Sequence, residues 1–241
     1  MQESLILSVE TATPGGSIAV LRGTTVLAKW HSVESFPHSN ALLGEIEKVL
    51  QGASLEIKDL NLLAVVVGPG SFTGLRVGLA TVKGLSTALQ IPALGIPTLE
   101  AVAYDAKRSG TNCVVIPAGR TEFFAQNFHL DEKEFFRPVD ELKHGKLIDI
   151  LEETQKTDLL HWVVTREAET LINEFAANEK LSRWTVALVP ENIALCAGQI
   201  AFARQFEGEL LLADSLQIIY GRDANIRRKK TFENKAEECN G

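Results

Sequence analysis

Residues 62–78 read Leu-Leu-Ala-Val-Val-Val-Gly-Pro-Gly-Ser-Phe-Thr-Gly-Leu-Arg-Val-Gly, an order that predicts a strand, a glycine loop and then a helix. The run Leu62–Val67 has the length and β-branching of a buried strand. Pro69 cannot donate into a strand ladder, so the strand ends before it. Ser71 or Thr73 can cap the helix that follows, because a hydroxyl oxygen accepts from the free N–H groups of a helix start.

The loop itself suits close contact with another molecule. Gly68, Gly70 and Gly74 let a ligand or a chain approach the main chain, and a helix start attracts an anion. A Walker loop is excluded, since no Gly-x-x-x-x-Gly-Lys-Ser/Thr run occurs in the chain. The dinucleotide fingerprint is closer, but the next expected strand, Pro92–Ile96, ends without the acid that would hold a ribose. A phosphate, a partner's backbone and a plain tight turn all remain open.

The helix after the loop contains glycines that need a reason. Gly78 and Gly84 interrupt the pattern Leu75–Leu89, and each costs about 1 kcal/mol relative to alanine. Residues four apart share a helix face, so small residues form two stripes: Gly74 with Gly78, and Ala80 with Gly84 and Ala88. These stripes predict that a neighbouring helix comes close, and that neighbour can belong in part to another chain.

Composition favours a cytosolic protein. The chain has 241 residues, 45% of them hydrophobic, and a formal net charge of −7, which argues against a surface that grips nucleic acid throughout. No segment reaches the roughly 20 apolar residues of a membrane span, and Glu3 and Glu10 lie where a signal peptide would be positive. The three cysteines, Cys113, Cys196 and Cys239, are widely spaced and predict reduced thiols.

The order of expected elements predicts an α/β fold with two domains and mixed sheets. The first domain, residues 1–103, begins with an antiparallel meander of three strands (Leu5–Glu10, Ser17–Leu21, Val26–Val33) and continues as alternating helix and strand. The second, residues 104–241, repeats this theme, and its final segment can pack back on the first domain. Its expected strands are Cys113–Pro117, Glu122–Leu130, Leu159–Thr165 and Thr185–Val189; its expected helices are Glu141–Glu153, Glu167–Asn178 and Pro190 to about Phe206.

Several of these segments together resemble the TsaB (YeaZ) family. They are Ile6-Leu-Ser-Val-Glu-Thr-Ala-Thr, Phe36-Pro-His-Ser, the glycine loop and its helix, Lys83-Gly-Leu, and Ile91-Pro-Ala-Leu-Gly-Ile-Pro-Thr-Leu-Glu-Ala. In the second half only Pro117-Ala-Gly-Arg-Thr-Glu-Phe-Phe and Ile219-Tyr-Gly-Arg are similar to family landmarks. The resemblance is therefore dense over about the first hundred residues and sparse afterwards.

The resemblance implies the duplicated fold shared by actin, Hsp70 and sugar kinases. It also implies a scaffold without an active site or cofactor of its own. With its catalytic relative TsaD and the ATPase TsaE, such a scaffold helps place a threonylcarbamoyl group on the adenosine beside the anticodon of tRNAs that read codons starting with A. Contact with tRNA is expected mainly through that complex, and a homodimer in isolation is left open.

The resemblance further implies that TsaD, or a second copy, binds the first two helices, here about Ser39–Gln51 and Thr73–Leu89. The residues expected at this interface are Ser39, Leu42, Leu43, Ile46, Gly70, Ser71, Phe72, Thr73, Gly74, Arg76, Val77, Gly78, Ala80, Thr81 and Gly84. A phosphate, if one binds, is expected to contact Glu10, Thr11, Gly68, Gly70 and Ser71.

One departure from the family pattern bears on catalysis. The usual Asp-Thr-Ser-Thr is Glu10-Thr-Ala-Thr13 here. In active kinases of this fold an aspartate at this point helps hold the metal of the nucleotide. No two of the five histidines are four residues apart, and Ser71 lacks a Gly-x-Ser-x-Gly context, so no catalytic or metal-binding residue is predicted. The alternative function is a free-standing ATP-dependent phosphotransferase in which Glu10 and the glycine loop bind the nucleotide.

Overall fold

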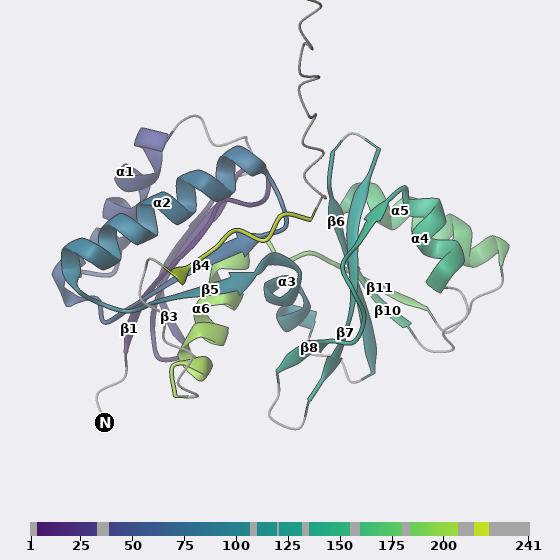
Figure 1. Cartoon of the computed structure of the whole chain (residues 1–241). Coiled ribbons are helices and arrows are strands. Elements are labelled where there is room, and N and C mark those ends of the chain that lie inside the picture. The colour runs from purple at the N-terminus through teal and green to yellow at the C-terminus, as the bar shows by residue number, and fades with distance from the viewer. Residues whose placement is uncertain are drawn as a thin grey trace, which may run out of the picture.

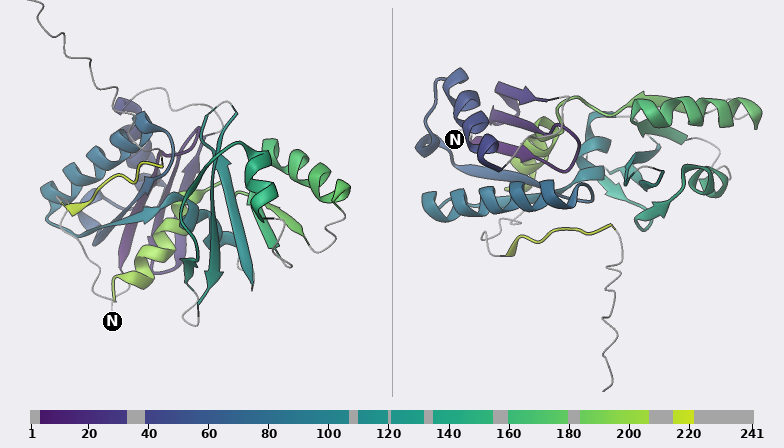
Figure 2. Two further views of the ribbon diagram at one scale, coloured as in Figure 1. Left: turned by 45° about the vertical axis from the view of Figure 1, so that its right-hand side comes forward. Right: turned by 90° about the horizontal axis from the view of Figure 1, so that it is seen from above.

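The computed structural model describes residues 4–32, 39–106, 110–119, 121–131, 135–154, 160–179, 184–206 and 215–221. Two α/β domains stand side by side, each built on a mixed sheet with helices packed against it (Figures 1 and 2). The predicted fold class is thus confirmed. None of the helices in these ranges is long and apolar enough to cross a membrane.

The sheet of the first domain has the strand order β3-β2-β1-β4-β5. Strands β1 (Leu5–Glu10), β2 (Ser17–Arg22) and β3 (Thr25–His31) form the expected antiparallel meander. Strand β4 (Leu62–Gly68) is parallel to β1, and β5 (Ala93–Pro97) is parallel to β4. All seven residues of β4 are buried, as a central strand covered on both faces requires.

Helices cover both faces of this sheet. On one face lie α1 (Ser39–Gly52), the short helix η1 (Ile57–Asp59) and α2 (Phe72–Leu89), whose apolar residues share a core cluster with β1, β2 and β4. On the other face α3 (Thr98–Ala106) packs with α6 (Ile193–Arg204), which contacts β1, β2 and β4. A helix from the far end of the chain therefore completes the core of the first domain.

The sheet of the second domain has the order β11-β10-β6-β7-β8, with β9 also paired to β7. Its strands are β6 (Thr111–Pro117), β7 (Phe123–Leu130), β8 (Phe136–Pro138), β9 (Lys143–Gly145), β10 (Leu160–Val164) and β11 (Thr185–Leu188). Helices α4 (Leu147–Thr154) and α5 (Arg166–Asn178) pack against the fully buried Trp162.

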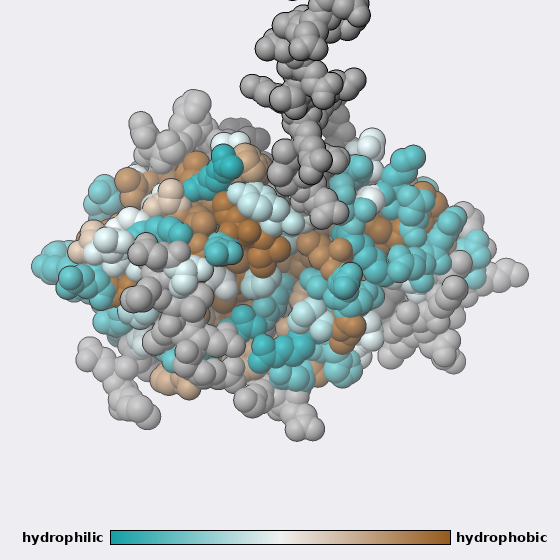
Figure 3. Space-filling view, in the orientation of Figure 1, coloured by the Kyte–Doolittle hydropathy of each residue, from teal (hydrophilic) through white to brown (hydrophobic). Residues whose placement is uncertain are grey.

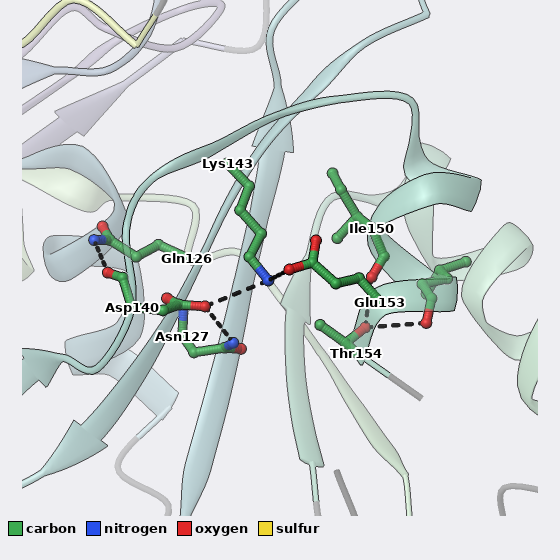
Figure 4. Close-up of polar contacts among 8 residues, drawn as sticks. Gln126, Asn127, Asp140, Lys143, Ile150, Glu153 and Thr154 are labelled. Atoms are coloured by element: carbon green, nitrogen blue, oxygen red, sulfur yellow. Dashed lines mark hydrogen bonds and ion pairs between the residues drawn. The ribbon is translucent and has the colours of Figure 1, made fainter. Parts of the chain in front are cut away.

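The predicted helix Glu141–Glu153 is wrong over its first residues, which form β9 instead. Asp140 explains the difference, because its carboxylate accepts from the backbone N–H (2.8 Å) and the side-chain amide (2.7 Å) of Asn127. Lys143 Nζ then lies 3.5 Å from Asp140 and 2.9 Å from Glu153, so it joins β9 to α4 (Figure 4). These long-range contacts hold residues 140–145 against β7, and the helix begins only at Leu147.

The predicted start of the last helix at Pro190 is also wrong. Asn192 is the N-cap of α6, and its side chain accepts from Leu195 N–H at 2.8 Å. The amide of the same buried side chain donates to the carbonyls of Ile18 (3.2 Å) and Trp30 (2.9 Å). Asn192 thus caps α6 and attaches it to β2 and β3 of the first domain, and the local sequence does not show these distant contacts.

Candidate functional site: the interdomain cleft and the face of α2

The glycine loop joins the end of β4 to the start of α2. Ser71 is the N-cap of α2, with its hydroxyl accepting from Gly74 N–H at 3.2 Å, so of the two predicted caps the structure selects Ser71. The Ser71 N–H donates to the carbonyl of Ala12 at 2.7 Å. One N–H of the expected anion site is therefore already used by the turn after β1.

Two glycines of the loop are approached by this chain's own backbone. A Cβ atom on Gly68, whose φ is +114°, would overlap the carbonyl oxygen of Ile219. A Cβ atom on Gly70 would overlap the carbonyl of Ala12. The glycines predict close approach by another molecule, whereas the groups that lie against Gly68 and Gly70 in this structure belong to the same chain.

The first small-residue stripe of α2 also faces this chain. A Cβ atom on Gly74 would overlap the carbonyl oxygen of Thr11, and one on Gly78 would overlap the Thr11 hydroxyl. The Thr11 hydroxyl donates to the carbonyl of Gly74 at 2.7 Å. The prediction that this stripe receives a neighbouring helix is wrong, because β1 and the turn after it fill the space.

Glu10 points into the protein rather than toward a ligand. Its side chain is buried, and one carboxylate oxygen accepts from the Thr13 N–H (2.7 Å) and the Thr13 hydroxyl (3.1 Å). The other oxygen accepts from the Ser17 hydroxyl at 3.0 Å, and Ser17 in turn accepts from Ala194 N–H at the start of α6. Burial raises the pKa of Glu10 above its ordinary value, although these hydrogen bonds act in the opposite direction. Glu10 therefore holds the β1–β2 turn together, and Thr11 joins this turn to α2.

A cleft of about 1580 Å³ opens between the two domains. The first domain contributes Ala12, Pro14 and the residues around the start of α2, where the Arg76 guanidinium lies 3.8 Å above the Phe72 ring. The second domain contributes Phe124 and the pair His144–Glu122, whose Nε2 and Oε2 atoms are 3.2 Å apart. Residues 219–221 form a further wall.

Sequence reasoning assigned no role to these residues of the second domain. Glu122 and Phe124 lie in the Pro117–Phe124 segment and Tyr220 in the Ile219–Arg222 segment, the two stretches of the second half that resemble the family. The resemblance of these two segments to the family is the sequence feature that points to Glu122, Phe124 and Tyr220 as site residues. Over the described ranges of the chain, no group of three or more histidine, cysteine or carboxylate side chains is placed to hold a metal ion.

The outer face of α2 is open. Nothing in the described structure lies within 4 Å of a Cβ atom placed on Gly84, and Ala80, Gly84 and Ala88 are exposed. Hydrophobic side chains gather near this helix where the domains meet (Figure 3), and Phe72 and Tyr220 are both about half exposed, at 52% and 51%.

The predicted interface residues divide into outer and inner groups. Leu43, Phe72, Thr73, Arg76, Ala80 and Gly84 are exposed, and Val77 and Thr81 are half-buried. By contrast, Leu42, Ile46 and Gly78 are buried within this chain, so these three belong to its core and cannot contact a partner. The side chain of Ser39 lies outside the described residues.

The chain shares its two-domain fold with solved structures of the actin-like class. YeaZ from Pseudomonas aeruginosa superposes with a TM-score of 0.70 at 21% identity, covering 90% of this chain and 99% of that one. The activator of 2-hydroxyisocaproyl-CoA dehydratase from Clostridium difficile, solved with bound ADPNP, gives a TM-score of 0.54 at 10% identity, covering 89% of this chain and 99% of that one. These likenesses establish the fold.

Sequence comparison supports a family assignment. Residues 32–151 match the family model described as TsaD: tRNA N6-adenosine threonylcarbamoyltransferase. The Escherichia coli protein named tRNA threonylcarbamoyladenosine biosynthesis protein TsaB is 32% identical over 130 residues, or 53% of this chain and 56% of that protein. The Bacillus subtilis protein of the same name is 33% identical over 98 residues, which are 41% of this chain and 43% of that protein. These similarities support assignment of the chain to the TsaB (YeaZ) family, and the chain spans about half the length of the curated relatives it matches.

Proposed function

We propose that this chain is a non-catalytic subunit in the synthesis of threonylcarbamoyladenosine on tRNA, and that it supports a TsaD-type catalytic subunit together with the ATPase TsaE. The names of its relatives support the pathway. The scaffold role and the two partners are inferred from the resemblance and from the site.

The observation that carries the proposal is the contrast between the glycines of α2. Gly74 and Gly78 are small because Thr11 fills the space beside them. Gly84 has open space, yet a glycine in a helix interior costs about 1 kcal/mol relative to alanine. Nothing within the described chain uses that lack of a side chain, so close approach of another protein supplies a reason for it.

We infer that the partner binds the exposed residues Thr73, Arg76, Ala80 and Gly84 of α2, with Leu43 of α1 at the edge of the same surface. Leu43 is 48% exposed although it is a large apolar residue. Apolar and small residues on an exposed helix face are suited to helix packing at close range. The same surface is available to a second copy of this chain when the partner is absent.

The position of Glu10 supports the non-catalytic part of the proposal. Every hydrogen bond described for its carboxylate comes from the same chain, and its burial favours the neutral form. A group that holds a metal-bound nucleotide must instead present its oxygen atoms to the ligand. Purified chain is therefore expected to hydrolyse neither ATP nor peptides.

Binding to TsaD is the direct test of the interface. Size-exclusion chromatography of the chain with TsaD should give a complex, and Gly84→Leu should abolish it while the protein stays folded, because a bulky side chain then blocks the approach. Glu47→Gln, on an exposed position of α1, is the matched control and should leave assembly intact. Unchanged assembly of a folded Gly84→Leu protein would remove this face of α2 from the interface.

The open cleft favours a second candidate, the free-standing ATP-dependent phosphotransferase. Among the described residues that line it are the cationic Arg76 and the aromatic side chains of Phe72, Phe124 and Tyr220. Calorimetry separates the two candidates: tight ATP binding by the isolated chain, with turnover that is lost in Glu10→Ala, would favour the phosphotransferase and overturn the scaffold.

A further inference from the structure

Residues 215–221 run along the first domain and reach the cleft, which Ile219, Tyr220 and Gly221 line (Figures 1 and 2). This short segment makes three kinds of contact: one in the core of the first domain, one with the main chain of the glycine loop, and one at the junction of the two domains. At each of these contacts a glycine leaves room for the neighbouring group: Gly95 beside the buried Leu216, Gly68 beside Ile219, and Gly221 beside Phe124.

The first contact anchors the segment in the first domain. Leu216 is 3% exposed and belongs to the core cluster that contains Val65, Val67 and Leu79. A Cβ atom on Gly95 of β5 would lie 3.2 Å from a methyl group of Leu216, so the glycine makes room for this side chain. Burying a leucine is one of the larger single contributions to stability, which makes Leu216 the anchor.

The second contact covers the glycine loop. The N–H of Ile219 donates to the carbonyl of Val67 at 2.8 Å, at the end of β4. The carbonyl of Ile219 then lies against Gly68, where any larger residue would overlap it. The segment therefore occupies the place from which a ligand would approach the main chain of Gly68.

The third contact lies between the domains. A Cβ atom on Gly221 would overlap the ring of Phe124 in β7 of the second domain, and it would lie 2.9 Å from Pro69 of the first. Beside it, the ring centroids of Tyr220 and Phe72 are 5.6 Å apart. Gly221 thus fits between the two domains only because it has no side chain.

We propose that residues 215–221 form a strap that covers the glycine loop at one wall of the cleft and fixes the two domains relative to each other. A ligand reaches the main chain of Gly68 only after the strap detaches. The strap also ends on Phe72, the first residue of α2, so its attachment influences the start of the helix whose outer face is exposed. This device does not depend on the function proposed above.

Hydrogen exchange of the full-length chain, followed by mass spectrometry, tests the proposal. Leu216→Ala removes the anchor and Gly221→Val forces the strap out of the junction; Gln217→Ala changes an exposed residue of the same segment and is the control. In both strap variants we expect peptides covering Gly68–Ser71 and Ile219 to exchange at least tenfold faster, with Gln217→Ala unchanged. Peptides of β10 and α5 report global unfolding, and they should keep the rates of the unmodified chain.

Two results would overturn the proposal. If the strap peptide exchanges faster while the Gly68–Ser71 peptide keeps its protection, the strap does not cover the loop. If neither variant changes the exchange of the strap, its contacts do not hold it. Should Leu216→Ala unfold the chain, Gly221→Val decides the question alone, because its added side chain meets Phe124 and Pro69 at the domain junction and leaves Leu216 in place.

Discussion

Replacing Glu10 distinguishes a structural carboxylate from one that holds a ligand. In Glu10→Ala, the donors of Thr13 and Ser17 lose their acceptor. A buried donor left unsatisfied costs about 1–3 kcal/mol. Ser17 is buried and cannot find water, whereas Thr13 is partly exposed and can. We therefore expect a loss of about 2–4 kcal/mol in the free energy of unfolding, including the cavity left behind.

Glu10→Gln is the matched control, since it keeps the shape and one acceptor oxygen and removes the charge. Because the pKa of Glu10 is raised in the folded state, the folded protein binds the proton more tightly than the unfolded chain. The associated stability is present below the unfolded pKa of about 4.3 and is lost as pH rises through the folded pKa. Glu10→Gln should lack this decline, and at neutral pH it should be within about 1 kcal/mol of the unmodified chain or more stable.

Urea unfolding of the three proteins between pH 4 and pH 8 measures both effects. A Glu10→Ala protein as stable as the unmodified chain would refute the structural role of the carboxylate. A Glu10→Gln protein as unstable as Glu10→Ala would show instead that the negative charge itself is needed at this position.

Further predictions concern α2, its loop and the contact between Asp140 and β7. Gly78→Ala should lower the free energy of unfolding by about 1–3 kcal/mol, because the added methyl group overlaps Thr11. Gly84→Ala should raise it by about 1 kcal/mol, because the space beside Gly84 is open and alanine favours the helix. Thermal denaturation of the two variants compares these changes. Gly70→Val should abolish partner binding because its side chain would displace the Ala12 turn. Arg76→Ala should keep the Kd for TsaD within tenfold of that of the unmodified chain, a change of at most about 1.4 kcal/mol. Titration of both variants against TsaD, with and without nucleotide, measures these effects. A nucleotide-dependent loss for Arg76→Ala alone would instead assign Arg76 to an anion. Asp140→Ala should destabilise the second domain by about 1–3 kcal/mol, seen as faster hydrogen exchange in β7 and β9, because Asn127 loses its acceptor.

The sequence predicted the parts of the fold that rest on local pattern. The apolar run of β4, the hydroxyl cap at Ser71 and the antiparallel meander depend on residues close together in the chain, and the structure confirms them. Local pattern also suggested a helix from Glu141, but Asn127 and Asp140 form contacts across 13 residues that hold this segment as a strand. The competition between local propensity and a distant partner is not visible in one sequence.

Of the candidate site, the sequence predicts the loop and the helix that follows it, which rest on local pattern, but not the distant residues that pack against them. The glycines of the loop predict close approach by another molecule, but the residues that approach them in the structure, Ala12 and Ile219, belong to this chain and cannot be identified from spacing. The stripe of Gly74 and Gly78 and the stripe of Gly84 look alike in sequence. Only the position of Thr11 shows that the first faces inward, while the second is open.

Reconstitution of threonylcarbamoyladenosine synthesis tests the central claim most directly. Transfer to tRNA would be measured with TsaD and TsaE, with or without this chain, using Gly84→Arg and the control Glu47→Gln. The account predicts that product requires the chain, that Glu47→Gln supports full activity, and that Gly84→Arg, although folded, supports none. Equal product without the chain, or full activity with Gly84→Arg, would contradict a scaffold that acts through the exposed face of α2.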